Sequence, residues 1–158
     1  MRRTASILLS VSAAALAFAA TIAMAQTPSP RDFPNVGDLM NTVIQPRHAK
    51  LGLAGAQQNW PLAGYLVNEL QQSFANVGKI HPMWRRLSLP DMFESTVGEP
   101  LKALGAAVKS RNAADFAAAY AKLTAACNAC HTAANHPFIV IKVPNQSAFP
   151  NQDFHAKP

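Results

Sequence analysis

Residues 112–137 read NAADFAAAYAKLTAACNACHTAANHP, and this alanine-rich stretch predicts one long helix. Asn112 is a favourable N-cap, and the helix should end by about Asn135, because a proline at position 137 disfavours helical backbone just before it. Side chains separated by four, three, four and three residues fall within roughly 80° of one another on such a helix. These are Phe116, Tyr120, Leu123, Cys127 and Cys130. The only two cysteines of the chain should therefore lie on the face that contacts the core.

The two cysteines belong to Cys127-Asn128-Ala129-Cys130-His131, the C-x-x-C-H pattern of covalent haem attachment. A haem has two vinyl groups, and each can form a thioether with a thiol. One helical turn brings thiols at positions i and i+3 close together, and the next residue can reach the iron from the same side. The pattern predicts one haem c bound through Cys127 and Cys130, with His131 as the proximal iron ligand.

Other interpretations of the cysteine pair are open at this point. An exported protein can close a C-x-x-C disulfide or use the pair as a thiol oxidoreductase, although the redox motif is typical of a βαβ setting that this sequence lacks. A zinc site would need two more ligands, and the remaining histidines follow no finger-like spacing: His48, His81, His136 and His155. The pattern can also arise by chance in an alanine-rich helix. We favour haem.

Three further helices are expected before this one. The first should run from about Val36 to Ala56, and Pro46 should bend or divide it because proline supplies no N–H. Asn59 is the expected N-cap of the second helix, and the third should cover Asp91 to Ser110. Four amphipathic helices with short connections predict an all-α fold. We expect an antiparallel four-helix bundle that encloses the haem over residues 35–136.

The residues after the last helix do not fit the helical pattern. The segment Phe138–Val143 is flanked by prolines and rich in β-branched residues, which are stiff at χ1 and favour extended backbone. It should be extended and lie against the bundle. We expect residues 137–158 to form an extended C-terminal tail anchored by Phe149 and Phe154.

The N-terminal residues predict export. Arg2 and Arg3 precede an apolar run that ends at Ala23-Met24-Ala25, which is typical of a signal peptide, here residues 1–25. The run is short for a membrane span, so we expect a periplasmic protein with no stable span after cleavage. Residues 26–34 should be a flexible lead-in. The formal charge of +6 is scattered, which disfavours nucleic-acid binding and leaves an acidic protein partner or an anionic membrane face open.

An exported four-helix chain with C-x-x-C-H near the end of its last helix resembles the cytochrome c′ group and its six-coordinate relatives. The resemblance covers about residues 33–135 and implies haem held by Cys127 and Cys130, with His131 as proximal ligand. The family often has an aromatic residue and an arginine three and four residues after the haem histidine, where this chain has Ala134 and Asn135. Some relatives pair through their first two helices, so a homodimer is open by analogy.

The group on the other side of the iron decides between two functions. The candidate distal ligands are Met40 and, as the alternative, His48 in the first helix, about 12 Å apart along a continuous helix. If either one binds the iron, the closed site suits a soluble electron-transfer protein with a redox partner protein of unknown identity. If neither binds, the open iron could take NO or CO for sensing or scavenging. No acid–base or nucleophile pattern indicates an enzyme.

Overall fold

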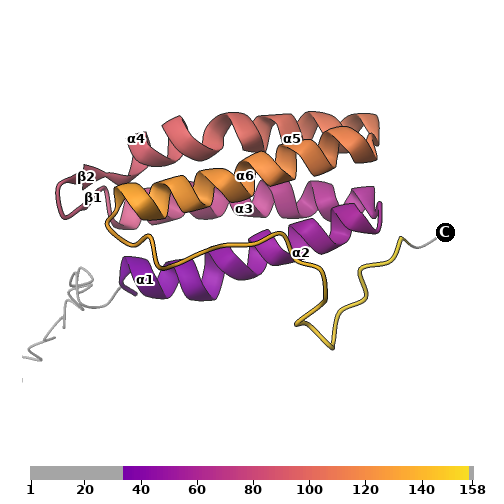
Figure 1. The fold of residues 1–158 in the computed structure, drawn as a ribbon, viewed down its shortest axis with the longest axis horizontal. Helices are drawn as coiled ribbons and strands as arrows, with labels where there is room; N and C mark the ends of the chain where they lie inside the picture. The colour runs from indigo at the N-terminus through magenta and orange to yellow at the C-terminus, as the bar shows by residue number, and fades with distance from the viewer. Residues whose placement is uncertain (1–33, 157–158) are drawn as a thin grey trace, which may run out of the picture.

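The computed structural model describes residues 34–156, which are mostly helical (Figure 1). The predicted signal peptide and residues 26–33 of the predicted lead-in lie outside the described residues. The described part has the four expected helical stretches, and the all-α class is confirmed. Their elements are α1 (Val36–Leu39), the π-helical turn η2 (Met40–Ile44) and α2 (Gln45–Ala56); α3 (Trp60–Ile80); α4 (Leu89–Phe93), the π-helical turn η3 (Glu94–Gly98) and α5 (Glu99–Ser110); and α6 (Ala113–Ala133).

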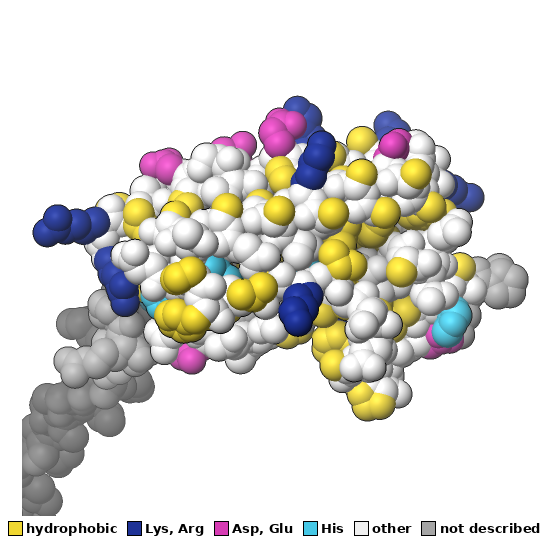
Figure 2. Space-filling view, viewed as in Figure 1, with side chains coloured by type: hydrophobic (Ala, Val, Ile, Leu, Met, Phe, Trp, Pro, Cys, Tyr) yellow, Lys and Arg dark blue, Asp and Glu magenta, His cyan; other side chains and the backbone are white. Residues whose placement is uncertain are grey.

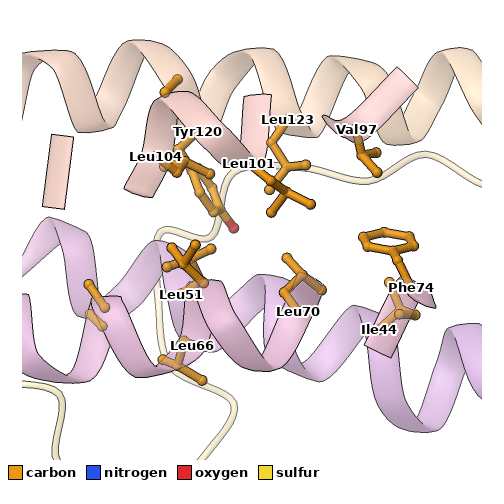
Figure 3. Close-up of a cluster of buried hydrophobic side chains, with 14 of the residues drawn as sticks. Ile44, Leu51, Leu66, Leu70, Phe74, Val97, Leu101, Leu104, Tyr120 and Leu123 are labelled. Carbon is orange, nitrogen blue, oxygen red and sulfur yellow. The ribbon is translucent and has the colours of Figure 1, made fainter. Parts of the chain in front are cut away.

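The helical stretches lie side by side and share one hydrophobic core (Figure 1). Helix α2 packs on α3 and α6, and α5 packs on the same two helices. Their facing side chains include Leu51, Leu66, Leu70, Leu104 and Leu123 (Figure 3). Full burial of one such side chain contributes about 1.5–3 kcal/mol. No helix within residues 34–156 combines the length and apolar content that crossing a bilayer requires.

Pro46 neither divides the first helical stretch nor ends it. The chain widens into η2, where the N–H of Gln45 bonds to the carbonyl of Met40, five residues earlier. Pro46 then lies in the first turn of α2, where its missing N–H costs little. Pro100 follows η3 in the same way at the start of α5. Local widening of the helix therefore accommodates both prolines.

The connector between α3 and α4 contains a small hairpin that the sequence did not predict. Strand β1 (Met83–Trp84) pairs antiparallel with β2 (Leu87–Ser88). Arg85, in the turn, has a φ of 56°, a conformation that two-residue hairpin turns usually give to glycine or asparagine. Its guanidinium lies over the ring of Trp84, 4.6 Å from the ring centroid, and such a contact contributes about 0.5–1 kcal/mol.

After α6 the described chain has turns and irregular backbone with no further helix or strand, and it crosses the outside of the helices (Figure 1). Phe154 is buried, and Phe149 packs against the core, so both expected anchors make contact. Asn59 caps α3 by accepting a hydrogen bond from the N–H of Leu62. Its side-chain amide also donates to the carbonyl of Phe154 at 3.3 Å and to that of His155 at 3.0 Å. One side chain thus starts a helix and holds the tail.

Candidate functional site

The residues of the C-x-x-C-H pattern open onto one apolar cavity near the C-terminal end of α6. Cys127, Cys130 and His131 line it from α6, and Met40 and His48 line it from η2 and α2. The remaining wall is largely hydrophobic and includes Ile44, Phe74, Leu89, Met92, Phe93, Val97 and Ile141. The structure therefore brings together all five site residues that the sequence analysis selected.

Asn128, within the C-x-x-C-H pattern, and Asn135, just after α6, position the segment that forms the outer wall of the cavity. Helix α6 ends where Asn135 adopts a left-handed backbone with a φ of 61°, which turns the chain back across the cavity. The side chain of Asn128 then pairs with the backbone of Ile141. Its amide nitrogen donates to the Ile141 carbonyl at 3.0 Å, and its amide oxygen accepts from the Ile141 N–H at 2.7 Å. We call residues 138–143 the strap.

The strap also orients the ring of His131. The Nδ1 atom of His131 lies 2.8 Å from the carbonyl oxygen of Ile139. A carbonyl can only accept, so Nδ1 carries a hydrogen, and in the neutral ring Nε2 keeps its lone pair. A hydrogen bond of this kind fixes the tautomer and orientation of metal-binding histidines. His131 is thus prepared to bind a metal through Nε2.

His48 is held in a buried network with two hydroxyl groups of α6, and its side chain is 4% exposed. Its Nδ1 lies 3.0 Å from the hydroxyl of Tyr120, and its Nε2 lies 3.0 Å from the hydroxyl of Thr124. The rings of His48 and Tyr120 also stack, with centroids 4.7 Å apart. The Tyr120 hydroxyl donates to the His48 carbonyl at 2.7 Å, and the Thr124 hydroxyl donates to the Tyr120 carbonyl at 2.9 Å. A neutral His48 ring has one N–H, so it donates to one of these two hydroxyl oxygens. Iron binding by His48 would require its ring to leave this buried position, whereas Met40 lines the cavity without such partners in the residues that the structure describes.

Acid is expected to destabilise the protein through His48. Burial lowers the pKa of His48 from 6.5 to about 4. Between these values the unfolded chain binds a proton that the folded chain does not, so stability falls as the pH drops from 6.5 towards 4. The loss approaches about 3 kcal/mol, at 1.36 kcal/mol per pKa unit. Urea unfolding at pH 7 and pH 4.5 measures it.

The matched variants for this test are His48→Gln and His81→Gln. His48→Gln removes the buried titrating ring and should flatten the dependence of stability on pH over this range. His81 lies outside the cavity and bonds to the carbonyl of Pro34, so His81→Gln should keep the wild-type dependence. Equal dependence in wild type and His48→Gln would contradict the assignment.

The environment of the two thiols argues against redox chemistry at sulfur. The cysteines are free in the structure. Burial raises the pKa of Cys127 to about 12, with a further contribution from the neighbouring Cys130, whose own pKa burial also raises. Reactive thiols of oxidoreductases have lowered pKa values instead. The pair is better suited to a covalent attachment made during maturation.

The donor atoms and the apolar wall suit a haem, but the cavity is smaller than a haem. Its volume is about 160 Å³, close to that of an engineered cavity of about 150 Å³ that admits benzene. A macrocycle is larger, so the wall would have to move outward for a haem to be attached. Side-chain hydrogen bonds from Asn128 and His131 hold the strap across this wall. Comparison with protein-family models, curated proteins and solved structures gives no match.

Proposed function

We propose that this chain is an exported c-type cytochrome that carries one covalent haem c inside an antiparallel four-helix bundle and transfers electrons. One observation carries the proposal: two thiols and an imidazole on one turn of α6 line the same apolar cavity as Met40. Bound haem supplies an iron centre that accepts and donates one electron. The partner is a redox protein.

The side chains around the cavity have separate roles in this proposal. Cys127 and Cys130 would hold the haem through thioethers. His131, oriented by the Ile139 carbonyl, would bind the iron through Nε2. Met40 would supply a second iron ligand through its thioether. A thioether ligand and an apolar surrounding both favour the reduced state, so a comparatively high midpoint potential is expected.

A second function, gas binding, is favoured by the engagement of His48. Both of its ring nitrogens contact hydroxyl groups. If the Met40 side chain stays in the cavity wall, the iron has an open position. Such a protein would bind NO or CO for sensing or scavenging. Rapid CO binding by the ferrous protein, without displacement of a ligand, would support this function and contradict electron transfer.

Replacing Met40 by leucine is expected to convert the ferrous haem from low spin to high spin. The sharp α-band should disappear, and the midpoint potential should fall by on the order of 100 mV, because axial ligands set potentials over about 0.8 V. Met92→Leu is the matched control, since Met92 lines the same cavity. Leucine preserves most of the volume in both variants. If both variants change stability alone, Met40 is a packing residue.

The proposal as a whole is tested by maturation of the chain. Expression with a cytochrome c maturation system should give a coloured protein whose colour survives acid–acetone extraction. Its mass should exceed that of the processed polypeptide by one haem. A Cys127→Ser, Cys130→Ser double variant should be colourless after extraction. Colourless wild-type protein with the mass of the bare polypeptide would overturn the proposal.

A further inference from the structure

The strap presents a hydrophobic surface to solvent. Phe138 is 77% exposed, Val140 61% and Val143 55%. Two other strap residues, Ile139 and Ile141, line the cavity. Large exposed apolar groups that gather on one face commonly mark an interaction site. The strap therefore has one side toward the candidate haem site and another available to a partner.

The strap is fixed in place and does not hang loosely from the protein. The paired hydrogen bonds between Asn128 and Ile141 resemble the pairing between two strands. The Ile139 carbonyl accepts from His131, and the Ile139 N–H donates to the carbonyl of His136. A surface that is already ordered loses little conformational freedom when a partner binds. This favours recognition by a second protein.

Basic side chains flank the hydrophobic strap. Lys142 is part of it, and Arg85 lies over Trp84, whose ring is 5.5 Å from that of His136. Residues 116–152 contain no aspartate or glutamate. Figure 2 shows hydrophobic side chains gathered where the strap crosses the molecule, with basic side chains on both sides of them and an acidic side chain below them. Like charge disfavours a second copy of this chain as the occupant and favours a partner with carboxylates around an apolar contact.

Aromatic rings connect the cavity wall with this surface. Trp84 and His136 both line the cavity. The ring of His136 lies 5.5 Å from that of Trp84 and 5.5 Å from that of Phe138, between centroids. The exposed ring of Phe138 is thus linked by successive contacts to the place where a haem would lie. A partner on the strap would therefore lie next to the wall of the cavity.

From these features we propose that the strap, with Lys142 and Arg85, is the docking surface for an acidic redox partner. The inference rests on the proposed electron-transfer function. The partner covers Phe138 and Val140 with an apolar patch, and carboxylates around that patch pair with the two basic residues. In the exchange the ferrous iron loses one electron to the partner's acceptor, and no bond is formed or broken.

The test uses the holo-protein and a surface of defined chemistry. A gold electrode is coated with a mixed monolayer of carboxylate- and methyl-terminated thiols, and adsorption and electron exchange are measured separately. Wild type should adsorb more tightly and exchange electrons faster here than on an amine-terminated monolayer. Phe138→Ser and Lys142→Glu should each weaken adsorption and slow exchange on the order of 10-fold, with unchanged visible spectra.

Matched controls lie elsewhere on the molecule. Tyr65 is 59% exposed on α3, and Lys109 is exposed at the end of α5. Tyr65→Ser also replaces an exposed aromatic side chain by serine, and Lys109→Glu makes the same charge reversal as Lys142→Glu. Both variants should adsorb and exchange electrons as wild type does. If the controls lose as much as the strap variants, attraction is by net charge and the docking surface is wrong. Unchanged behaviour of both strap variants would also overturn it.

Two further measurements distinguish the acidic partner from two other possible occupants of the strap, a membrane surface and a second copy of this chain. Vesicles of phosphatidylcholine and phosphatidylglycerol test a membrane surface, and sedimentation velocity tests a second copy. Binding to vesicles, or dimerisation, that is lost in Phe138→Ser while adsorption and exchange on the electrode are kept would overturn the acidic partner. The visible spectrum, recorded before the electrode, vesicle and sedimentation measurements, shows whether the wild-type protein carries covalent haem. Absence of that haem counts against the proposed function, whereas adsorption of the protein still tests the strap.

Discussion

Replacement of His131 by alanine is expected to abolish the low-spin spectrum of the holo-protein. The imidazole is the proposed strong-field ligand on one side of the iron, and alanine supplies no ligand. The sharp α-band of the ferrous form should disappear, and the yield of covalent holo-protein should fall. Visible spectra of the purified protein in both oxidation states measure the effect.

His136→Ala is the matched control for this prediction. His136 lines the same cavity, and its Nδ1 also bonds to a backbone carbonyl, that of Ala134, at 2.7 Å. It differs from His131 in not following the second cysteine of the motif. His136→Ala should therefore keep the α-band. An unchanged spectrum in His131→Ala, or the same loss in both variants, would show that His131 is not the proximal ligand.

Local sequence signals predicted the helices well. Asn59 and Asn112 were recognised as N-caps, and each accepts hydrogen bonds from backbone N–H groups in the first turn of its helix. The spacing along α6 placed Phe116, Tyr120 and Leu123 in the core, and all three are buried. These features depend on residues a few positions apart, so one stretch of sequence is enough to reveal them.

Contacts between distant residues could not be predicted in this way. His48 contacts Tyr120 and Thr124, more than seventy residues later, and the sequence gives no signal for that pairing. Asn128 occupies a variable position of the C-x-x-C-H pattern, so its pairing with Ile141 had no expected role. The hairpin at Arg85 was missed for a different reason. Its turn lacks the glycine or asparagine that normally indicates such a conformation.

Gly55→Ala is expected to destabilise the protein strongly, because α2 and α6 approach closely there. A Cβ atom at position 55 would overlap the ring of Phe116. That ring cannot move aside easily, since it packs against Trp60 at 6.1 Å and Tyr120 at 6.0 Å between centroids. Overpacking of this kind costs about 1–3 kcal/mol and sometimes more. We expect about 3 kcal/mol, measured by urea unfolding.

Gly105→Ala in α5 is the control, because a Cβ atom added there meets no described atom within 4 Å apart from its chain neighbours and the local helix backbone. Alanine is favoured over glycine inside a helix by about 1 kcal/mol, so this variant should be as stable as wild type or more stable. Adding Phe116→Leu to Gly55→Ala should restore part of the lost stability, because the smaller side chain leaves room for the new methyl group. Such non-additivity is the signature of two residues in direct contact. If Gly55→Ala and Gly105→Ala were equally stable, α2 and α6 would be farther apart at Gly55 than they are in the structure. Tyr120 would then be too far from α2 to hold His48 in the cavity wall.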